Sequence, residues 1–210
     1  MVNEQTVRKL QEMRLATMAE SFQKQLLDTS YQELSFEERF GMLVDLEWSR
    51  HKNNRLTSLI RKADFQQSDA CIENIEYHAD RKLDRTQILR LASGTYIHDK
   101  LNMIIMGASG AGKTYLACAF GISACRNFLP VKYIRLPELL NDLAVARGEG
   151  IFGRVMKAYK KVPLLILDEW LLVSLKEIEA RDLLEIVEAR HQTGSTVSAH
   201  VLCRCPNHRH

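Results

Sequence analysis

One stretch, Gly107-Ala-Ser-Gly-Ala-Gly112-Lys113-Thr114, constrains the fold of this chain more than any other, because it matches the pattern G-x-x-x-x-G-K-T in full. Glycines allow the backbone to curl around a phosphate, so that several N–H groups and the positive end of the following helix face one anion. The apolar run Met103–Met106 before the loop predicts a buried strand, and the residues from Tyr115 to Arg126 have helical spacing. This strand-loop-helix context predicts a nucleotide-binding loop rather than a plain glycine-rich turn.

The residues of this loop have separate expected roles. Lys113 is expected to reach the β- and γ-phosphates and to act in catalysis, and Thr114 to offer its hydroxyl to Mg²⁺, a hard cation that prefers oxygen ligands. ATP and Mg²⁺ are therefore the expected cofactors. The residues expected to contact the nucleotide are Gly107, Ala108, Ser109, Gly110, Ala111, Gly112, Lys113, Thr114 and Tyr115.

A second apolar run, Leu164–Leu167, ends in the acids Asp168 and Glu169. A buried parallel strand that delivers carboxylates to its C-terminal edge has this pattern, although the run alone also fits a strand that ends in solvent. Behind a phosphate loop, Asp168 is expected to hold Mg²⁺ through water. Glu169 is expected to orient and deprotonate the attacking water.

The rest of the second half completes an α/β pattern. Val131–Leu136 predicts a strand, with Pro137 in the first turn of the next helix. Ile178–Arg190 predicts an amphipathic helix, and a further strand is expected from Ser195. The predicted fold is a parallel sheet flanked by helices with right-handed crossovers.

The first half predicts helices. One helix is expected over Glu4–Leu27, and Ser35-Phe-Glu-Glu38 has the form of a capping box that starts a second one. Asp84, with Gln87 three residues later, is expected to cap a short helix. Tyr96 and Ile97 stand where an adenine pocket could begin, or they belong to the core.

Two groups of basic residues are candidates for contact with nucleic-acid phosphates, and for both the alternative is a solvated helix face. The net charge of +3 and the sequence pI near 8.6 permit such a partner without requiring it. The first group lies in a stretch without acidic residues, and the second in a helical stretch broken by glycines. The candidates are Arg50, Lys52 and Arg55 in the first group and Arg147, Arg154, Lys157, Lys160 and Lys161 in the second.

Cysteine content and hydropathy bear on the compartment. The chain has five cysteines, an odd number that favours free thiols in a reducing environment. The charged residues of the N-terminus do not match a signal peptide, and no apolar run reaches the roughly 18 residues of a membrane span. A cytoplasmic protein without a membrane partner is expected.

Taken together, these motifs make the chain resemble the IstB-like transposition helper ATPases, a family related to the DnaC-type helicase loaders. The likeness extends from about Leu10 to Thr196. The stretches that carry it are Ser35-Phe-Glu-Glu-Arg-Phe with Leu43-Val-Asp-Leu-Glu-Trp48, Gly107–Thr114 followed by Tyr-Leu-Ala, Arg135-Leu-Pro, Leu143-Ala-Val-Ala-Arg-Gly, Leu164–Trp170 and Glu188-Ala-Arg-His.

The resemblance implies an AAA+ ATPase that assembles into oligomers, binds duplex DNA and hands target sites to a partner transposase. By the same likeness, a helical domain over residues 1–75 serves assembly and DNA contact. An ATP-binding domain follows over residues 76–196, in which the segment around Arg147 to Lys161 faces DNA. A role in replication, like that of a helicase loader, is the alternative. A small-molecule kinase is disfavoured, because no lid-like arginine segment follows Asp168.

Residues 197–210 depart from the family pattern, in which a polar sensor, a fifth strand and an arginine that completes a neighbour's site are expected. The change suggests a truncated gene or a shifted reading frame, hence an incomplete fold with impaired ATP hydrolysis. A fragment that binds nucleotide without useful turnover is therefore a rival interpretation. The tail also offers possible zinc ligands, although their spacing matches no common zinc module and an accidental tail explains them equally well. These ligands would be Cys203, Cys205, His208 and His210.

Overall fold

The computed structural model describes residues 2–78, 81, 83–170, 172 and 174–201. The chain divides into two compact units, Met1–Thr57 and Ser58–His210, and the boundary lies inside the long helix α3 (Phe36–Ala63). These units are defined by contacts within the chain and not by function. The boundary near residue 75 between an assembly and DNA-contact domain and an ATP-binding domain therefore stays a prediction. Among the described helices, none is both long and apolar enough to cross a membrane.

The first unit contains α1 (Val2–Glu12), α2 (Ala16–Leu27), η1 (Thr29–Glu33) and the first part of α3. The prediction of one helix over Glu4–Leu27 is wrong, because the chain turns at Arg14, whose φ is 63°. A left-handed arginine is uncommon, so the sequence gives no glycine or asparagine signal for this break.

The capping box at the start of α3 is confirmed. The Ser35 N–H donates to Glu38 Oε2 at 2.8 Å, and the Glu38 N–H donates to Ser35 Oγ at 3.2 Å. Farther along α3, the buried Glu47 accepts the Met18 N–H at 2.8 Å and so satisfies one of the orphan donors at the start of α2.

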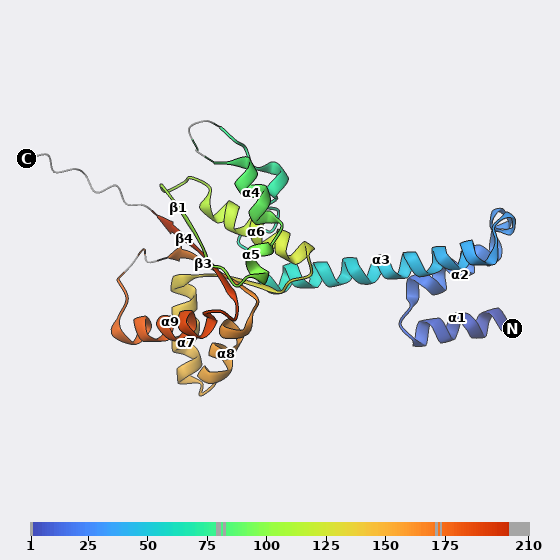
Figure 1. Cartoon of the computed structure of the whole chain (residues 1–210). Coiled ribbons are helices and arrows are strands. Elements are labelled where there is room, and N and C mark those ends of the chain that lie inside the picture. Colours follow the sequence, from blue (N-terminus) through green and yellow to red (C-terminus); the bar gives the residue numbers. More distant parts are fainter. Residues whose placement is uncertain (1, 79–80, 82, 171, 173, 202–210) are drawn as a thin grey trace, which may run out of the picture. The chain divides into compact units, whose positions relative to one another are not determined.

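The second unit holds an all-parallel sheet in the order β1-β4-β3-β2 (Figure 1). The predicted strands are therefore confirmed, with β4 between the strand that leads into the phosphate loop and the strand that ends in the two acids. The strands are β1 (Met103–Gly107), β2 (Val131–Arg135), β3 (Leu164–Trp170) and β4 (Ser195–Val201). The helical elements are η2 (Ile72–Asn74), α4 (Arg85–Ala92), α5 (Thr95–His98), α6 (Lys113–Arg126), α7 (Leu136–Gly148), α8 (Phe152–Lys161) and α9 (Glu177–Arg190).

Helices cover the sheet on both faces, as the apolar strands require. Helix α6 contacts all four strands on one face. On the other face, α7, α8 and α9 pack on the inward side chains of β2 and β3 through a shared cluster that includes Leu143, Met156, Leu165 and Ile186. Asp84 caps α4 as predicted, accepting the backbone N–H groups of Thr86 and Gln87.

The connector after α3, residues 64–71, is held against α6 and the sheet. The Phe65 ring lies so close to Gly121 of α6 that a side chain at Gly121 would collide with it. The Tyr115 hydroxyl, also on α6, contacts both the backbone N–H and the carbonyl of Cys71 at 3.1 Å. Tyr96 and Ile97 are buried core residues and do not line the pocket described below.

Candidate functional site

The phosphate loop links the end of β1 to the start of α6. Gly110 and Gly112 have φ values of 74° and 81°, in the left-handed region that favours glycine, and Gly112 is the N-cap of α6. This geometry explains the motif glycine Gly112 and the additional glycine Gly110 inside the loop. The first N–H groups of a helix have no partner within the helix, so the start of α6 at Lys113 is suited to an anion.

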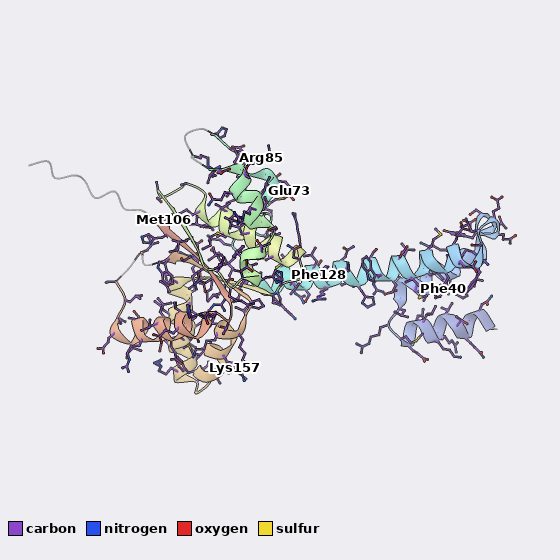
Figure 2. All side chains as sticks on the ribbon, viewed as in Figure 1. Phe40, Glu73, Arg85, Met106, Phe128 and Lys157 are labelled. Carbon is purple, nitrogen blue, oxygen red and sulfur yellow. The ribbon has the colours of Figure 1, made fainter. Side chains whose placement is uncertain are left out.

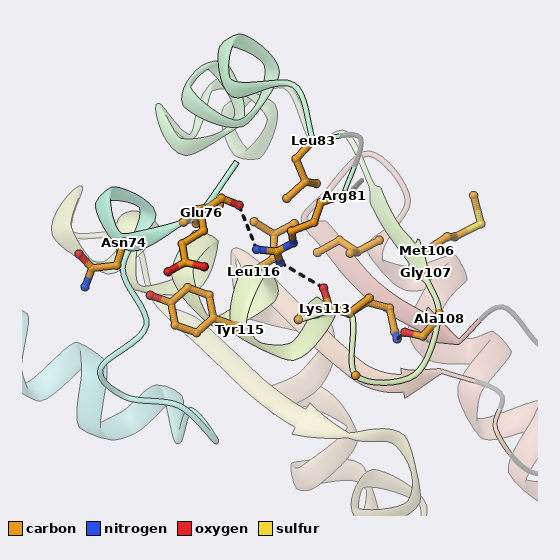
Figure 3. Close-up of a pocket in the computed structure, with 15 residues that line it drawn as sticks. Asn74, Glu76, Arg81, Leu83, Met106, Gly107, Ala108, Lys113, Tyr115 and Leu116 are labelled. Atoms are coloured by element: carbon orange, nitrogen blue, oxygen red, sulfur yellow. Dashed lines mark hydrogen bonds between the residues drawn. The ribbon is translucent and has the colours of Figure 1, made fainter. Parts of the chain in front are cut away.

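A pocket of about 730 Å³ opens on this loop (Figure 3). Its volume lies within the range usual for small-molecule sites. One wall is the loop itself, and the other is the segment before α4, for which the sequence motifs make no prediction. The lining residues are Asn74, Ile75, Glu76, Arg81, Leu83, Ile105, Met106, Gly107, Ala108, Gly110, Ala111, Gly112, Lys113, Tyr115 and Leu116.

Among the described residues, two cations line this pocket. The Lys113 ammonium donates to the Ala108 carbonyl at 2.6 Å and so folds back over its own loop. Arg81 donates to the Glu76 carbonyl at 3.0 Å and to the Ala111 carbonyl at 3.2 Å, which ties the segment before α4 to the loop (Figure 3). Arg81 lies outside the phosphate-loop motif, so the motif gives no signal for its place in the pocket.

Thr114 and Asp168 meet as expected, although they are 54 residues apart. The Thr114 hydroxyl donates to Asp168 Oδ2 at 2.7 Å, and the Asp168 side chain is buried. A hydroxyl and a carboxylate oxygen side by side fit Mg²⁺, which takes one or two protein carboxylates and completes its shell with water and phosphate. One hydroxyl and one carboxylate leave the other positions of the cation to water and phosphate oxygens, so this donor set suits a nucleotide-bound cation.

Glu169 follows Asp168 at an irregular point of β3. Its φ is 53°, and the register with β4 shifts between Leu167 and Trp170. Such a bulge redirects a side chain and is common beside functional sites. Both Glu169 carboxylate oxygens lie 2.7 Å from Arg135 Nη2 of β2. The hydrogen bond and charge of Glu169 raise the pKa of Arg135, so the guanidinium is charged.

Tyr133, also on β2, was missed as a site residue. Its hydroxyl lies 2.8 Å from Asp168 Oδ2 and 2.8 Å from Gln66 Oε1. Burial, followed by the hydrogen bond to Asp168, raises the pKa of Tyr133, so the hydroxyl remains protonated. One sequence feature could have indicated Tyr133: Tyr133 and Arg135 flank the apolar Ile134 on β2, the strand that pairs with the acidic strand β3.

The second group of basic residues divides in two. Two of its members have internal partners. Arg147 donates to both Asp182 carboxylate oxygens at 2.8 Å, and its guanidinium lies 4.2 Å from the centre of the Phe152 ring. Lys160 pairs with Glu185 at 2.5 Å. The other three form the α8 cationic row, spaced three and four residues apart and exposed, and no ion pair involves them within the described part of the chain. The α8 cationic row is Arg154, Lys157 (labelled in Figure 2) and Lys161.

The first basic group lies on α3. Arg50 pairs with Glu47 at 3.4 Å, and the Lys52 ammonium lies 3.6 Å from the centre of the Trp48 ring. Lys52 and Arg55 are exposed. The proposed zinc ligands of the tail, Cys203 to His210, lie outside the described residues. Near the end of β4, His200 Nδ1 lies 2.8 Å from the Trp170 carbonyl oxygen.

Comparison with known proteins agrees with this geometry. A family model described as "IstB-like ATP binding protein" matches residues 8–203. A protein of Pseudomonas fluorescens named for ATP binding in insertion sequence IS1162 is 38% identical over 94% of this chain and 85% of its own length. The insertion-sequence protein y4pL of Sinorhizobium fredii is 39% identical over 91% of this chain and 78% of its own length.

Solved structures share the fold at lower identity. A DNA replication initiation factor has a TM-score of 0.60 and 21% identity, covering 66% of this chain and 43% of that one. A DnaC helicase loader has a TM-score of 0.54 and 17% identity, covering 65% of this chain and 80% of that one. The predicted α/β fold, a parallel sheet of the AAA+ type with flanking helices, is thereby confirmed.

Proposed function

Because the chain belongs to the IstB-like ATP-binding family, we propose that it is an ATP-binding helper of DNA transposition that acts beside a partner transposase. The observation that carries this proposal is the contact between Thr114 and Asp168 at the mouth of a phosphate loop. The Thr114 hydroxyl at the end of the loop and the Asp168 carboxylate of the acidic strand β3 are the two oxygen donors that a Mg²⁺–ATP site needs.

The pocket supports ATP as the ligand. The loop N–H groups and the start of α6 would hold phosphate oxygens, and Lys113, which now donates to the Ala108 carbonyl, would turn to the β- and γ-phosphates. The apolar side chains of Ile75, Leu83 and Leu116 offer a surface for the base. Thr114 and Asp168 would hold Mg²⁺, which supplies neutralisation of the phosphate charge.

Glu169 is the residue proposed to take a proton from the attacking water in ATP hydrolysis. It stands directly beside Asp168, and its bulged backbone turns it toward Arg135. Hydrolysis therefore requires that Glu169 be at least partly released from that ion pair.

Duplex DNA is the proposed macromolecular partner. The α8 cationic row presents three positive charges without internal ion pairs, and such a row binds backbone phosphates in a salt-dependent and sequence-tolerant way. The cations of α3, Arg50, Lys52 and Arg55, are a second candidate surface, within the region 1–75 proposed for assembly and DNA contact. Self-association and contact with a transposase are proposed on the family resemblance alone.

Equilibrium titration with a fluorescent ATP analogue tests the nucleotide site. Replacing Lys113 by alanine should weaken binding about 10- to 100-fold, because a charge-assisted contact to phosphate is worth about 1.5–3 kcal/mol. Lys157→Ala removes the same charge from an exposed position on α8 and is the matched control. Equal affinities of the Lys113 variant and the unaltered chain would refute the nucleotide site.

A further inference from the structure

We propose that Tyr133 and Gln66 form a positioning relay that fixes the Asp168 carboxylate for Mg²⁺. The relay rests on the proposed Mg²⁺–ATP site and adds two residues from outside its motifs, one on β2 and one in the connector after α3. Tyr133 is a positioning residue, because it acts through Asp168 and does not itself line the nucleotide pocket.

The Asp168 carboxylate is held by three donors in a buried position. Oδ2 accepts from the hydroxyls of Thr114 at 2.7 Å and Tyr133 at 2.8 Å, and Oδ1 accepts the Glu169 N–H at 2.8 Å. Only 3% of the Asp168 surface is exposed, so little water is available to replace a lost donor. Each of the three donors therefore contributes to the orientation of this carboxylate.

The Tyr133 hydroxyl, unlike that of Thr114, is not proposed to bind the cation. The Thr114 hydroxyl is assigned both to Asp168 and to the cation, whereas the Tyr133 hydroxyl points only to Asp168 and Gln66. It can therefore keep Asp168 in place when the cation engages Thr114. Residues that hold a metal ligand from behind in this way commonly change metal affinity when they are altered.

The direction of the relay follows from counting hydrogens. A tyrosine hydroxyl has one hydrogen, so it cannot donate to Asp168 and to Gln66 Oε1 at the same time. The oxygen and nitrogen of a glutamine amide have nearly the same size and shape, and turning the Gln66 amide places its NH₂ group against the hydroxyl. Gln66 then donates to Tyr133, and Tyr133 donates to Asp168.

The connector that carries Gln66 is fixed on both sides of it. Phe65 is buried against Gly121, and its ring lies 6.4 Å from that of Tyr133. Asp64 pairs with Lys132 of β2 at 3.7 Å. Gln66 is thus held beside Tyr133 by its neighbours.

Tyr133→Phe removes the hydroxyl and keeps the ring. The measured quantity is the Mg²⁺ concentration that gives half of the maximal binding of a fluorescent ATP analogue, with a parallel titration in EDTA. We expect this Mg²⁺ concentration to rise about tenfold, as is usual when a group behind a metal ligand is lost. The affinity measured in EDTA should stay unchanged, because the phosphate loop is untouched.

A matched control exists in Tyr159, another buried tyrosine whose hydroxyl donates to a carboxylate, Asp142 Oδ2, at 2.9 Å. Tyr159→Phe should leave the Mg²⁺ requirement unchanged. Equal shifts in the Tyr133 and Tyr159 variants would show a general loss of stability and overturn the relay. Gln66→Ala should raise the Mg²⁺ requirement as well, by a smaller factor than Tyr133→Phe. Because Gln66 is exposed, this variant also tests the relay if Tyr133→Phe does not fold.

A fourth variant, Asp168→Asn, separates the relay from the proposed function. If Asp168→Asn raises the Mg²⁺ requirement while Tyr133→Phe and Gln66→Ala leave it unchanged, the Mg²⁺ site stands and the relay is refuted. If Asp168→Asn leaves the requirement unchanged, the Mg²⁺ site itself is refuted, and the relay with it.

Discussion

Replacing Arg190 by methionine should destabilise the second unit, because this buried side chain holds the starts of β3 and β4 together. Arg190 is 2% exposed at the end of α9. It donates to the carbonyls of Tyr159 at 2.9 Å and Val162 at 2.7 Å, to the Ser195 carbonyl, and through Nε to Thr196 Oγ1 at 3.0 Å. No carboxylate within the described chain pairs with it. Its partners are almost all backbone oxygens.

The size of the effect is a difference between two opposing terms. Methionine leaves three buried carbonyls without this donor, which costs about 3–6 kcal/mol at 1–2 kcal/mol each. Burial also lowers the pKa of Arg190 to about 10, and removing the buried charge returns about 3 kcal/mol. The expected net loss therefore lies between zero and about 3 kcal/mol and is centred near 1.5 kcal/mol, a sizeable share of the stability of an ordinary domain.

Urea unfolding followed by tryptophan fluorescence measures this loss. The chain has two tryptophans, Trp48 in the first unit and Trp170 in the second, so a Trp48→Phe background makes the signal report the second unit. The midpoint should fall by about 0.75 M, given a urea slope of about 2 kcal/mol per M. Arg154→Met makes the same chemical change at an exposed site and is the control. Equal midpoints for the two variants would refute the role assigned to Arg190.

Two further predictions concern charge. Replacing the α8 cationic row by glutamines should weaken binding to duplex DNA of any sequence. The slope of log binding constant against log salt concentration should fall by about 3, since each phosphate contact contributes about 0.9. An unchanged slope would make the row a solvated helix face, and the same test applies to Arg50, Lys52 and Arg55. Burial raises the pKa of the Cys118 thiol to about 11, so the stabilisation by its neutral form is complete below about pH 9 and is lost as the pH rises through 11. Mass spectrometry should find native Cys118 unalkylated at pH 8, and rapid alkylation there would contradict this.

The parts of the site that the sequence predicts are those in which local backbone geometry and chemistry set the residue. Gly110 and Gly112 have to be glycines for their positive φ, and Thr114 and Asp168 have to carry oxygen ligands at the ends of adjoining elements. Such requirements restrict the residue type at each position, so they can be recognised in one sequence. The parallel direction of the strands follows from the same reasoning, because apolar runs joined by crossover helices favour a parallel sheet, whereas the strand order β1-β4-β3-β2 is given by the structure.

The missed parts depend on contacts between residues far apart in the chain. Tyr133 and Gln66 are separated by 67 residues, and neither has a neighbour in sequence that reveals the bond. The Glu188-Ala-Arg-His stretch was recognised as a family feature, but the role of Arg190 in holding two strands emerged only from the fold. The break at Arg14 was missed because arginine is not a residue that usually marks a left-handed turn.

The pair formed by Arg135 and Glu169 bears on how hydrolysis would be controlled. A carboxylate that accepts a proton from water needs a free oxygen, but both Glu169 oxygens lie 2.7 Å from Arg135 Nη2. The pair is partly exposed, with 39% and 30% of the two side chains accessible, so its attraction is screened. An ion pair of this kind is worth about 1 kcal/mol, which can be overcome during turnover.

Arg135→Ala should therefore raise ATP hydrolysis measured without DNA, by about fivefold at most, since 1 kcal/mol corresponds to that factor. Arg126→Ala, which removes the guanidinium from the exposed pair with Glu73, is the control and should leave the rate unchanged. Adding Glu169→Gln should abolish the gain, because the released group is then no longer a base. A lower rate in the Arg135 variant would mean that Arg135 positions Glu169 for the reaction instead of restraining it. A gain that persists in the double variant would exclude Glu169 as the group that Arg135 restrains.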